Sequence, residues 1–252
     1  MKKIIPFLSF FLITGIAFSQ ENGLTKNTWG VKLRESHFHL GADLQTKYVW
    51  RGMEMITQDA APVVFPQINY QNKGWYAYVM GGYAINGKYA EVDLGVSYTY
   101  KWLTVGVNNY YYPTTNTAED DYFNFKSHQT GHWFEGVITI APEKIPAYLT
   151  ISNFFAGADK KADGKQAYST YAELGGHYDF LNDHQLALAL GAAFNKSCYN
   201  GYAHNFGICN IELKYTYNVQ FKNNFTLPLS VAYILNPVYE KSHVNFTMKF
   251  AY

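Results

Sequence analysis

Hydrophobic and polar residues alternate along most of the chain with a period of two, and the spacing of an amphipathic helix is rare. Between Phe38 and Trp50, for example, even positions are mostly apolar or aromatic, whereas odd positions include Asp43 and Lys47. Successive side chains of a β-strand point to opposite faces, so this period predicts strands with one apolar face. Twelve segments follow the pattern: 36–51, 61–71, 74–85, 88–101, 102–112, 131–141, 146–155, 167–180, 184–196, 206–219, 223–235 and 241–252.

The connections between these segments alternate in length. Tight connections at 71–74, 101–103, 142–146, 182–184 and 222–224 alternate with longer ones at 51–60, 113–130, 157–166, 198–205 and 236–241, and only 86–88 is short on the long-loop side. Short turns on one rim and long loops on the other are typical of outer-membrane barrels. Because lipid cannot satisfy the polar groups of an open sheet edge, the barrel must close. The predicted fold is therefore all-β, a transmembrane up-and-down antiparallel barrel of about 12 strands over 36–252, with both termini on the short-turn rim.

The composition favours a wall in contact with lipid. Aromatic residues make up 18% of the chain, with 23 tyrosines, and charged residues make up only 15%. Outer-membrane barrels carry an apolar band with aromatic girdles outside and polar side chains inside. The alternative is a soluble periplasmic sandwich or lipocalin-like barrel with its apolar faces inward, but its outer faces should then carry more Lys and Glu residues.

The N-terminus has the features of a secretory signal peptide. Two lysines precede an apolar run at 4–16 that is too short to span a membrane, and small residues allow cleavage after Ser19. We predict a signal peptide at 1–19 and a periplasmic lead-in segment at 20–35, with an N-terminal membrane anchor as the alternative. Cleavage leaves 18 basic and 19 acidic residues, so no nucleic-acid partner is expected.

The first predicted strand ends in the segment YVWRG, Tyr48–Gly52. We expect Tyr48 and Trp50 to face lipid at headgroup depth, within an aromatic girdle. The same alternation turns Arg51 toward the channel mouth. There it either pairs with an inward carboxylate and stabilises the wall, or it narrows and charges the pore. Gly52 allows the chain to turn into the next loop.

The YVWRG pentapeptide resembles the motif with which TorF-type porins begin their barrel. FPQINY at 65–70, GWYAYVMGGYA at 74–84 and AEVDLGVSYTY at 90–100 are similar to the next elements of that family, in the same order. The resemblance extends over about 40–112. It implies an outer-membrane β-barrel that acts as a channel, and it leaves the solute undefined.

Charged and histidine side chains on the predicted lumen faces are the candidates for pore lining. Carboxylates outnumber cations among them by seven to four, and an excess of one charge sign sets the selectivity of a pore. The first functional hypothesis is thus a channel for small polar solutes with a weak cation preference. The candidates are His37, His39, Asp43, Lys47, Arg51, Glu91, Asp93, Glu135, Glu173, His177, Asp179, Glu212, Lys214 and Lys249.

Two other functions stay open at this point. A non-conducting barrel could bind a ligand or partner through its extracellular loops, above all the long loop at 113–130. A lipid-modifying enzyme needs a nucleophile near a histidine and an acid. The nearest candidates are Ser127, His128, His132 and Glu135, but this stretch lacks the His-x-Ser-Asn-Gly element of phospholipase barrels and is interpreted as a surface loop leading into a strand.

Metal-binding and thiol residues are few. His37 and His39 form a single His-x-His pair, which is a weak signal, so no metal site and no cofactor is predicted. Cys198 and Cys209 flank one predicted hairpin loop. In an oxidising compartment they are candidates for a disulfide, with two free thiols as the alternative.

These features together predict a multi-pass barrel of the Gram-negative outer membrane. Its expected partners are outer-membrane lipids and lipopolysaccharide, the barrel assembly machinery and small solutes. The sequence leaves the oligomeric state open.

Tyr252 ends the last apolar strand face with an aromatic residue, the type of signal that the assembly machinery reads. Deletion of Tyr252 should therefore reduce the amount of folded barrel in the outer-membrane fraction. The measurement is the protein band that changes mobility on boiling in detergent gels. The variant Tyr252→Phe keeps the ring and should assemble normally; equal assembly of the deletion variant would contradict the prediction.

Overall fold

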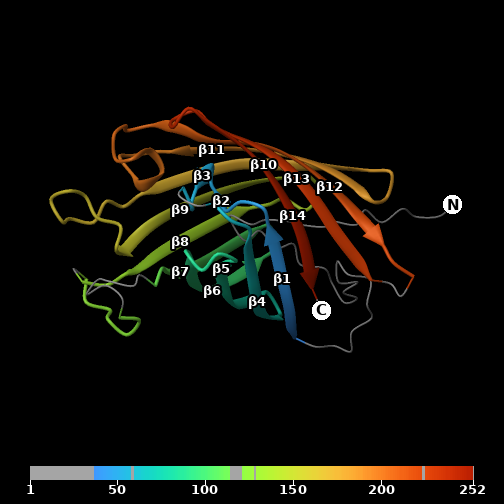
Figure 1. The fold of residues 1–252 in the computed structure, drawn as a ribbon, viewed down its shortest axis with the longest axis horizontal. Helices are drawn as coiled ribbons and strands as arrows, with labels where there is room; N and C mark the ends of the chain where they lie inside the picture. Colours follow the sequence, from blue (N-terminus) through green and yellow to red (C-terminus); the bar gives the residue numbers. More distant parts are fainter. Residues whose placement is uncertain (1–36, 58–59, 114–120, 128, 223–224, 252) are drawn as a thin grey trace.

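Twelve antiparallel strands form a closed barrel in the computed structural model, which describes residues 37–57, 60–113, 121–127, 129–222 and 225–251 (Figure 1). The predicted all-β barrel is confirmed. The strands are β1 (Phe38–Gln45), β4 (Val63–Asn72), β5 (Trp75–Ala84), β6 (Ala90–Tyr100), β7 (Leu103–Tyr111), β8 (His132–Ile140), β9 (Ala147–Gly157), β10 (Thr170–Phe180), β11 (His184–Ala193), β12 (Gly207–Gln220), β13 (Thr226–Asn236) and β14 (Lys241–Ala251).

Some predictions concern parts of the chain that the structure leaves undescribed. The signal peptide at 1–19, the lead-in segment at 20–35 and Tyr252 lie outside the described residues. Within the described residues, no helix is long and apolar enough to cross a membrane.

Each barrel strand pairs with its neighbours in the chain, and β1 closes the barrel against β14, with Gly41 opposite Ala251. The short turns have the backbone that their hairpins need. Lys73 and Gly74, between β4 and β5, have φ values of 47° and 86°. Positive φ at both central residues is the type I′ geometry that matches the twist of two paired strands. Gly74 is required there, since a Cβ would lie 2.5 Å from the carbonyl oxygen of Thr99.

The outer face of the barrel is apolar. Each strand turns large aliphatic or aromatic side chains outward, and these stay exposed; Leu188, for example, is 60% exposed. A continuous exposed apolar band is typical of a barrel that spans a membrane and is rare in soluble proteins. The alternative of a soluble barrel with inward apolar faces therefore does not hold. The side chains of this band include Leu40, Ile68, Val79, Val96, Val105, Ile138, Ile151, Leu174, Leu188, Leu213, Tyr233 and Phe246.

On the lumen face, tyrosine rings pack directly against glycines of the neighbouring strand. Tyr78 lies opposite Gly95, and Tyr148 lies opposite Gly175. A Cβ built on Gly95 would lie 2.1 Å from the Tyr78 ring, and one on Gly175 would lie 2.3 Å from the Tyr148 ring. The missing side chains thus make space for rings against the wall, an arrangement that also pins strand register.

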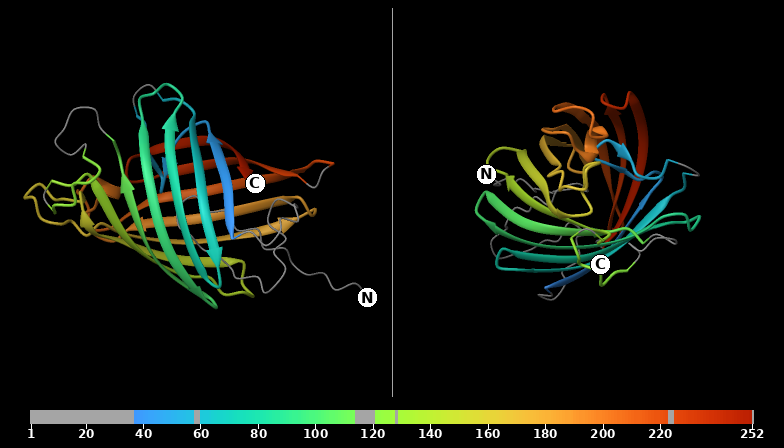
Figure 2. Two further views of the ribbon diagram at one scale, coloured as in Figure 1. Left: turned by 90° about the horizontal axis from the view of Figure 1, so that it is seen from below. Right: turned by 90° about the vertical axis from the view of Figure 1, so that its left-hand side faces the viewer.

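The first strand is shorter than predicted. β1 ends at Gln45, and the chain then continues inside the barrel as β2 (Val49–Trp50) and β3 (Met53–Glu54). The right-hand view of Figure 2 looks into the barrel from the end with the long loops. Tyr48 and Trp50 are only 6% and 7% exposed and belong to the interior cluster of hydrophobic side chains. The prediction that these two aromatics face lipid is therefore wrong.

The turn at Arg51–Gly52 explains this correction. Both residues have positive φ, 50° and 79°, and they form the two-residue connection between β2 and β3. The chain therefore reverses tightly at Gly52 and does not extend the wall. A Cβ at Gly52 would lie 1.8 Å from the carbonyl oxygen of Cys209, so only glycine allows the hairpin tip to approach β12 this closely.

The contact between Gly95 and Tyr78 should be sensitive to one added methyl group. Gly95→Ala should lower the free energy of unfolding by about 1–3 kcal/mol, because the new Cβ overpacks the ring. The measurement is urea-induced unfolding of the refolded barrel in lipid. Gly136→Ala is the matched control, since its Cβ would meet Phe155 at 3.7 Å, an ordinary contact distance. Equal stability of the two variants would contradict the prediction.

Candidate functional site

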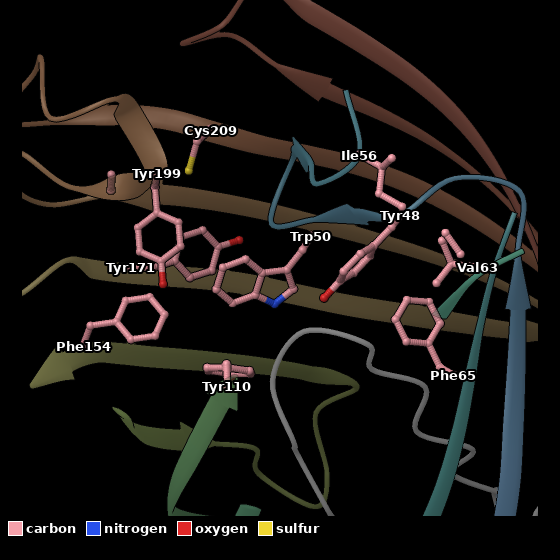
Figure 3. Close-up of a cluster of buried hydrophobic side chains, with 12 residues drawn as sticks. Tyr48, Trp50, Ile56, Val63, Phe65, Tyr110, Phe154, Tyr171, Tyr199 and Cys209 are labelled. Carbon is pink, nitrogen blue, oxygen red and sulfur yellow. The ribbon is translucent and has the colours of Figure 1, made fainter. Parts of the chain in front are cut away.

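One side of the lumen is filled by a segment that we call the plug, residues 46–56 together with the 3₁₀ helix η1 (Cys198–Asn200). Trp50 lies at its centre (Figure 3). The ring centroid of Trp50 is 5.7 Å from those of Tyr110 and Tyr199 and 6.3 Å from that of Phe154. The buried cluster consists of Tyr48, Trp50, Ile56, Val63, Phe65, Ala84, Tyr110, Phe154, Tyr171, Ala193, Tyr199 and Cys209.

Arg51 anchors the plug electrostatically. Its side chain is 1% exposed, and its guanidinium group donates hydrogen bonds to the Glu135 carboxylate and to the Tyr199 hydroxyl. The guanidinium carbon also lies 4.5 Å from the ring centroid of Trp50 and 4.6 Å from that of Tyr171, within cation–π range. Arg51 therefore links the plug to β8 and does not border an opening, which matches the wall-stabilising alternative proposed for it from the sequence.

Three further carboxylates, Glu91, Asp93 and Glu173, are at most 2% exposed on the plug side of the lumen. Tyrosine hydroxyls stabilise two of them. Tyr89 donates a hydrogen bond of 2.6 Å to Glu91, and Tyr148 donates one of 2.7 Å to Glu173. Buried in this way, the three side chains contact protein and not open space in the lumen.

A polar pocket of about 60 Å³ lies on the other side of the plug, along β1, β12, β13 and β14. It brings together four of the side chains that the sequence predicted to line the pore, two carboxylates and two ammonium groups. Lys214 donates a hydrogen bond of 3.0 Å to Glu212. The pocket is lined by Asp43, Glu212, Lys214 and Lys249, together with Ser230 and Thr247.

A small apolar contact bounds this pocket toward the long-loop rim. Val49 of the plug packs against Ala232 and Ile234 of β13, and all three side chains are buried. Beyond them lies a second charged group, which we call the outer cluster, made up of Lys47, Glu54 and His243. Lys47 forms an ion pair of 3.1 Å with Glu54, and His243 Nδ1 lies 3.8 Å from the same carboxylate.

The remaining pore-lining candidates lie near the short-turn rim, away from the plug. His37 is exposed and its ring contacts Tyr70, with 5.8 Å between centroids, while His39 is partly buried. His177 Nε2 lies 3.6 Å from the carboxylate of Asp179. Across the described ranges of the chain, no group of three His, Cys, Asp or Glu side chains is placed to hold a metal ion.

Cys198 and Cys209 are free thiols in the structure, so the predicted disulfide is not formed. The two residues do not occupy facing positions of the hairpin. Cys209 is the extra residue of a β-bulge opposite Gly191 and Ala192 in β11. Cys198 comes after the end of β11 and starts η1, which Tyr199 anchors inside the barrel. Burial raises the pKa of the Cys198 thiol to about 12.

The residues considered for an enzyme do not converge on one site. Glu135 faces the lumen and binds Arg51. The ring nitrogens of His132 lie 2.9 Å from the side-chain oxygen of Asn109 and 2.7 Å from the carbonyl oxygen of Tyr122. His132 and Glu135 therefore have separate sets of partners, and His128 lies outside the described residues.

Four important residues were not among the sequence-derived candidates. His243 lies on the polar face of the last predicted strand, and Val244 and Phe246 lie on the other face of the same strand. The alternation could therefore have identified His243. Val49, Glu54 and Tyr199 owe their positions to the plug. No strand periodicity predicts the direction of a side chain in a segment that folds back into the lumen.

Comparison of the sequence with protein-family models and with curated proteins gave no match. Among solved structures, the KdgM porin is 10% identical, with a TM-score of 0.49 over 85% of this chain and 98% of that one. An outer membrane channel from Pseudomonas putida F1 is 15% identical, with a TM-score of 0.46 over 91% of this chain and 99% of that one. Similarity at this level assigns neither a family nor a solute, and the resemblance to TorF-type porins stays a prediction.

Loss of one partner of the buried ion pair should be strongly destabilising. Arg51→Ala leaves Glu135 charged and unpaired in the interior and should lower the free energy of unfolding by about 3–5 kcal/mol, measured by urea unfolding in lipid. Replacing both partners, as in Arg51→Met with Glu135→Met, should cost less than Arg51→Ala alone. Lys165→Ala, which removes an exposed pair with Asp163, should change nothing measurable.

If Arg51→Ala proved as stable as the wild type, the anchoring role of this ion pair would be wrong. If the double variant lost more unfolding free energy than Arg51→Ala, the two methionines would not pack in place of the ion pair.

Proposed function

We propose that the protein is an outer-membrane channel for small polar solutes, with a narrow route between the plug and the wall formed by β12, β13, β14 and β1. The one-sided position of the plug is the observation that carries this proposal. The plug buries its aromatic side chains against β4, β5, β7, β9, β10, β11 and the start of β12. The opposite side retains the polar pocket and the outer cluster, which are separated by one layer of apolar side chains.

In this proposal, the contact of Val49 with Ala232 and Ile234 is the constriction of the channel. Hydrophobic constrictions restrict permeation because water and polar solutes are unstable beside apolar walls. Charged groups on either side, in the pocket and in the outer cluster, would hold a solute before and after it crosses.

Ion selectivity through this route should be weak. The cation preference predicted from the sequence counted seven carboxylates, but Glu91, Asp93, Glu135 and Glu173 are buried on the plug side. The pocket itself carries two carboxylates and two ammonium groups. Because the nearest charges balance, we propose that any preference for cations is small.

A non-conducting barrel that binds a partner through its loops is the second candidate. The observation that favours it is the extent of the plug, whose buried cluster contains twelve hydrophobic side chains. In that case the plug would hold the long-loop end of the barrel in one shape, and the pocket would have no role in transport.

Substitutions at Val49 test the channel proposal. In planar bilayers, Val49→Ser should raise the single-channel conductance because a hydroxyl group wets the constriction, and Val49→Leu should lower it because the side chain is larger. Val137→Ser is the matched control, because Val137 is 7% exposed on the lumen face of β8 and lies away from the pocket. The conductance of this variant should equal that of the wild type.

Folded wild-type protein and Val49→Ser protein that both fail to form channels, where a known porin succeeds, would reject the channel and favour the binding barrel. An equal response to Val49→Ser and Val137→Ser would reject Val49 as the constriction.

A further inference from the structure

The arrangement of charges in the pocket is specific. Asp43 of β1 lies directly opposite Lys249 of β14, and Glu212 and Lys214 lie two residues apart on β12. β13 runs between these two pairs and contributes only uncharged side chains to the pocket, at Pro228, Ser230, Ala232 and Ile234. The pocket therefore has an uncharged strand in its middle, with one acid and one base on each side of it.

One polar atom in the pocket is left without a partner. Asp43 is 4% exposed, and its Oδ1 has no hydrogen-bond donor among the described residues. Lys249 and Lys214 act on the carboxylate electrostatically, but neither donates to this oxygen. Glu91 Oε1 and Asp93 Oδ1 also lack a partner, but of the three residues only Asp43 lines the pocket. A buried polar atom without a hydrogen bond is costly, so an open acceptor position beside a pocket points to a bound donor group.

We propose that the pocket binds a small zwitterion that carries one ammonium and one carboxylate group. The ammonium group would donate to Asp43 Oδ1 near Glu212, and the carboxylate would lie between Lys214 and Lys249. A cation would be attracted by the two carboxylates of the pocket but repelled by its two ammonium groups, and an anion would meet the reverse. A zwitterion can satisfy both kinds of group. This inference deepens the proposed function, because the bound zwitterion is the solute that crosses at Val49.

The small size of the pocket favours a small solute. A volume of about 60 Å³ holds only a few water molecules, because one water needs at least about 10–15 Å³ of such space. A solute that displaces this water has about the size of glycine or alanine. Larger zwitterions would have to displace the plug or extend toward the short-turn rim.

Calorimetric titration of the full folded chain in detergent tests the inference, with L-alanine as the probe. Ethylammonium and propionate each carry one of its two charges, and glucose is neutral. Alanine should bind at least about tenfold more tightly than any of the three, because it alone makes both sets of charge-assisted hydrogen bonds. Glucose or a single-charge probe that binds as tightly as alanine would overturn the zwitterion assignment.

Two variants locate the binding site. Asp43→Asn and Lys214→Gln should each weaken alanine binding about tenfold, since each removes the charge of one hydrogen-bonding partner. Asp93→Asn is the matched control, because Asp93 is an equally buried carboxylate of the lumen that lies outside the pocket. The mobility shift on boiling shows that each variant is folded. Unchanged binding in both folded pocket variants would overturn the site.

The two proposals can fail separately, because the titration does not require conduction. A protein that conducts small ions in bilayers but does not bind alanine would overturn this inference and leave the channel standing. A protein that binds alanine through Asp43 but never conducts would support the pocket and reject the channel.

Discussion

A guanidinium group buried inside the barrel constrains the rest of the lumen. Arg51 cannot be neutralised by losing its proton, so its burial requires a carboxylate and further acceptors within reach. Glu135 on β8 and the Tyr199 hydroxyl on η1 meet this requirement from two distant parts of the chain. One charge therefore connects the β2–β3 hairpin, η1 and β8, and aromatic rings pack around it.

The barrel accommodates the plug because its wall is uneven. Glycines on the lumen face let neighbouring tyrosine rings lie against the wall, as Gly95 does for Tyr78. Gly52 at the hairpin tip touches the backbone at Cys209, where β12 carries a bulge. Bulges bend a strand and re-aim its side chains, so the wall and the plug fit by local changes of backbone and not by a wider barrel.

The sequence predicted the wall well and the plug poorly, for a physical reason. A membrane-spanning strand has lipid on one face and the lumen on the other. The alternation of apolar and polar residues therefore shows which side chains face lipid, as Leu188 on β11 and Phe246 on β14 do. Even β4, interrupted by Pro66, followed this rule. A hairpin inside the lumen has protein around it, and Tyr48 and Trp50 satisfy the same alternation there as in a lipid-facing girdle. The sequence predicted the charged residues of the pocket because they lie on wall strands. It did not predict Tyr199, because that residue lies on η1, outside the wall.

In the proposed channel, stability and permeation should depend on different residues of one short segment. Arg51 and Trp50 face the side of the lumen where the plug is held, and Val49, which comes just before Trp50 in β2, faces β13. Adjacent side chains of an extended segment point in opposite directions, so a two-residue strand is enough to separate the two roles. The plug can then be fixed firmly on one side by a buried ion pair while the opposite contact stays small, apolar and adjustable by a single side chain.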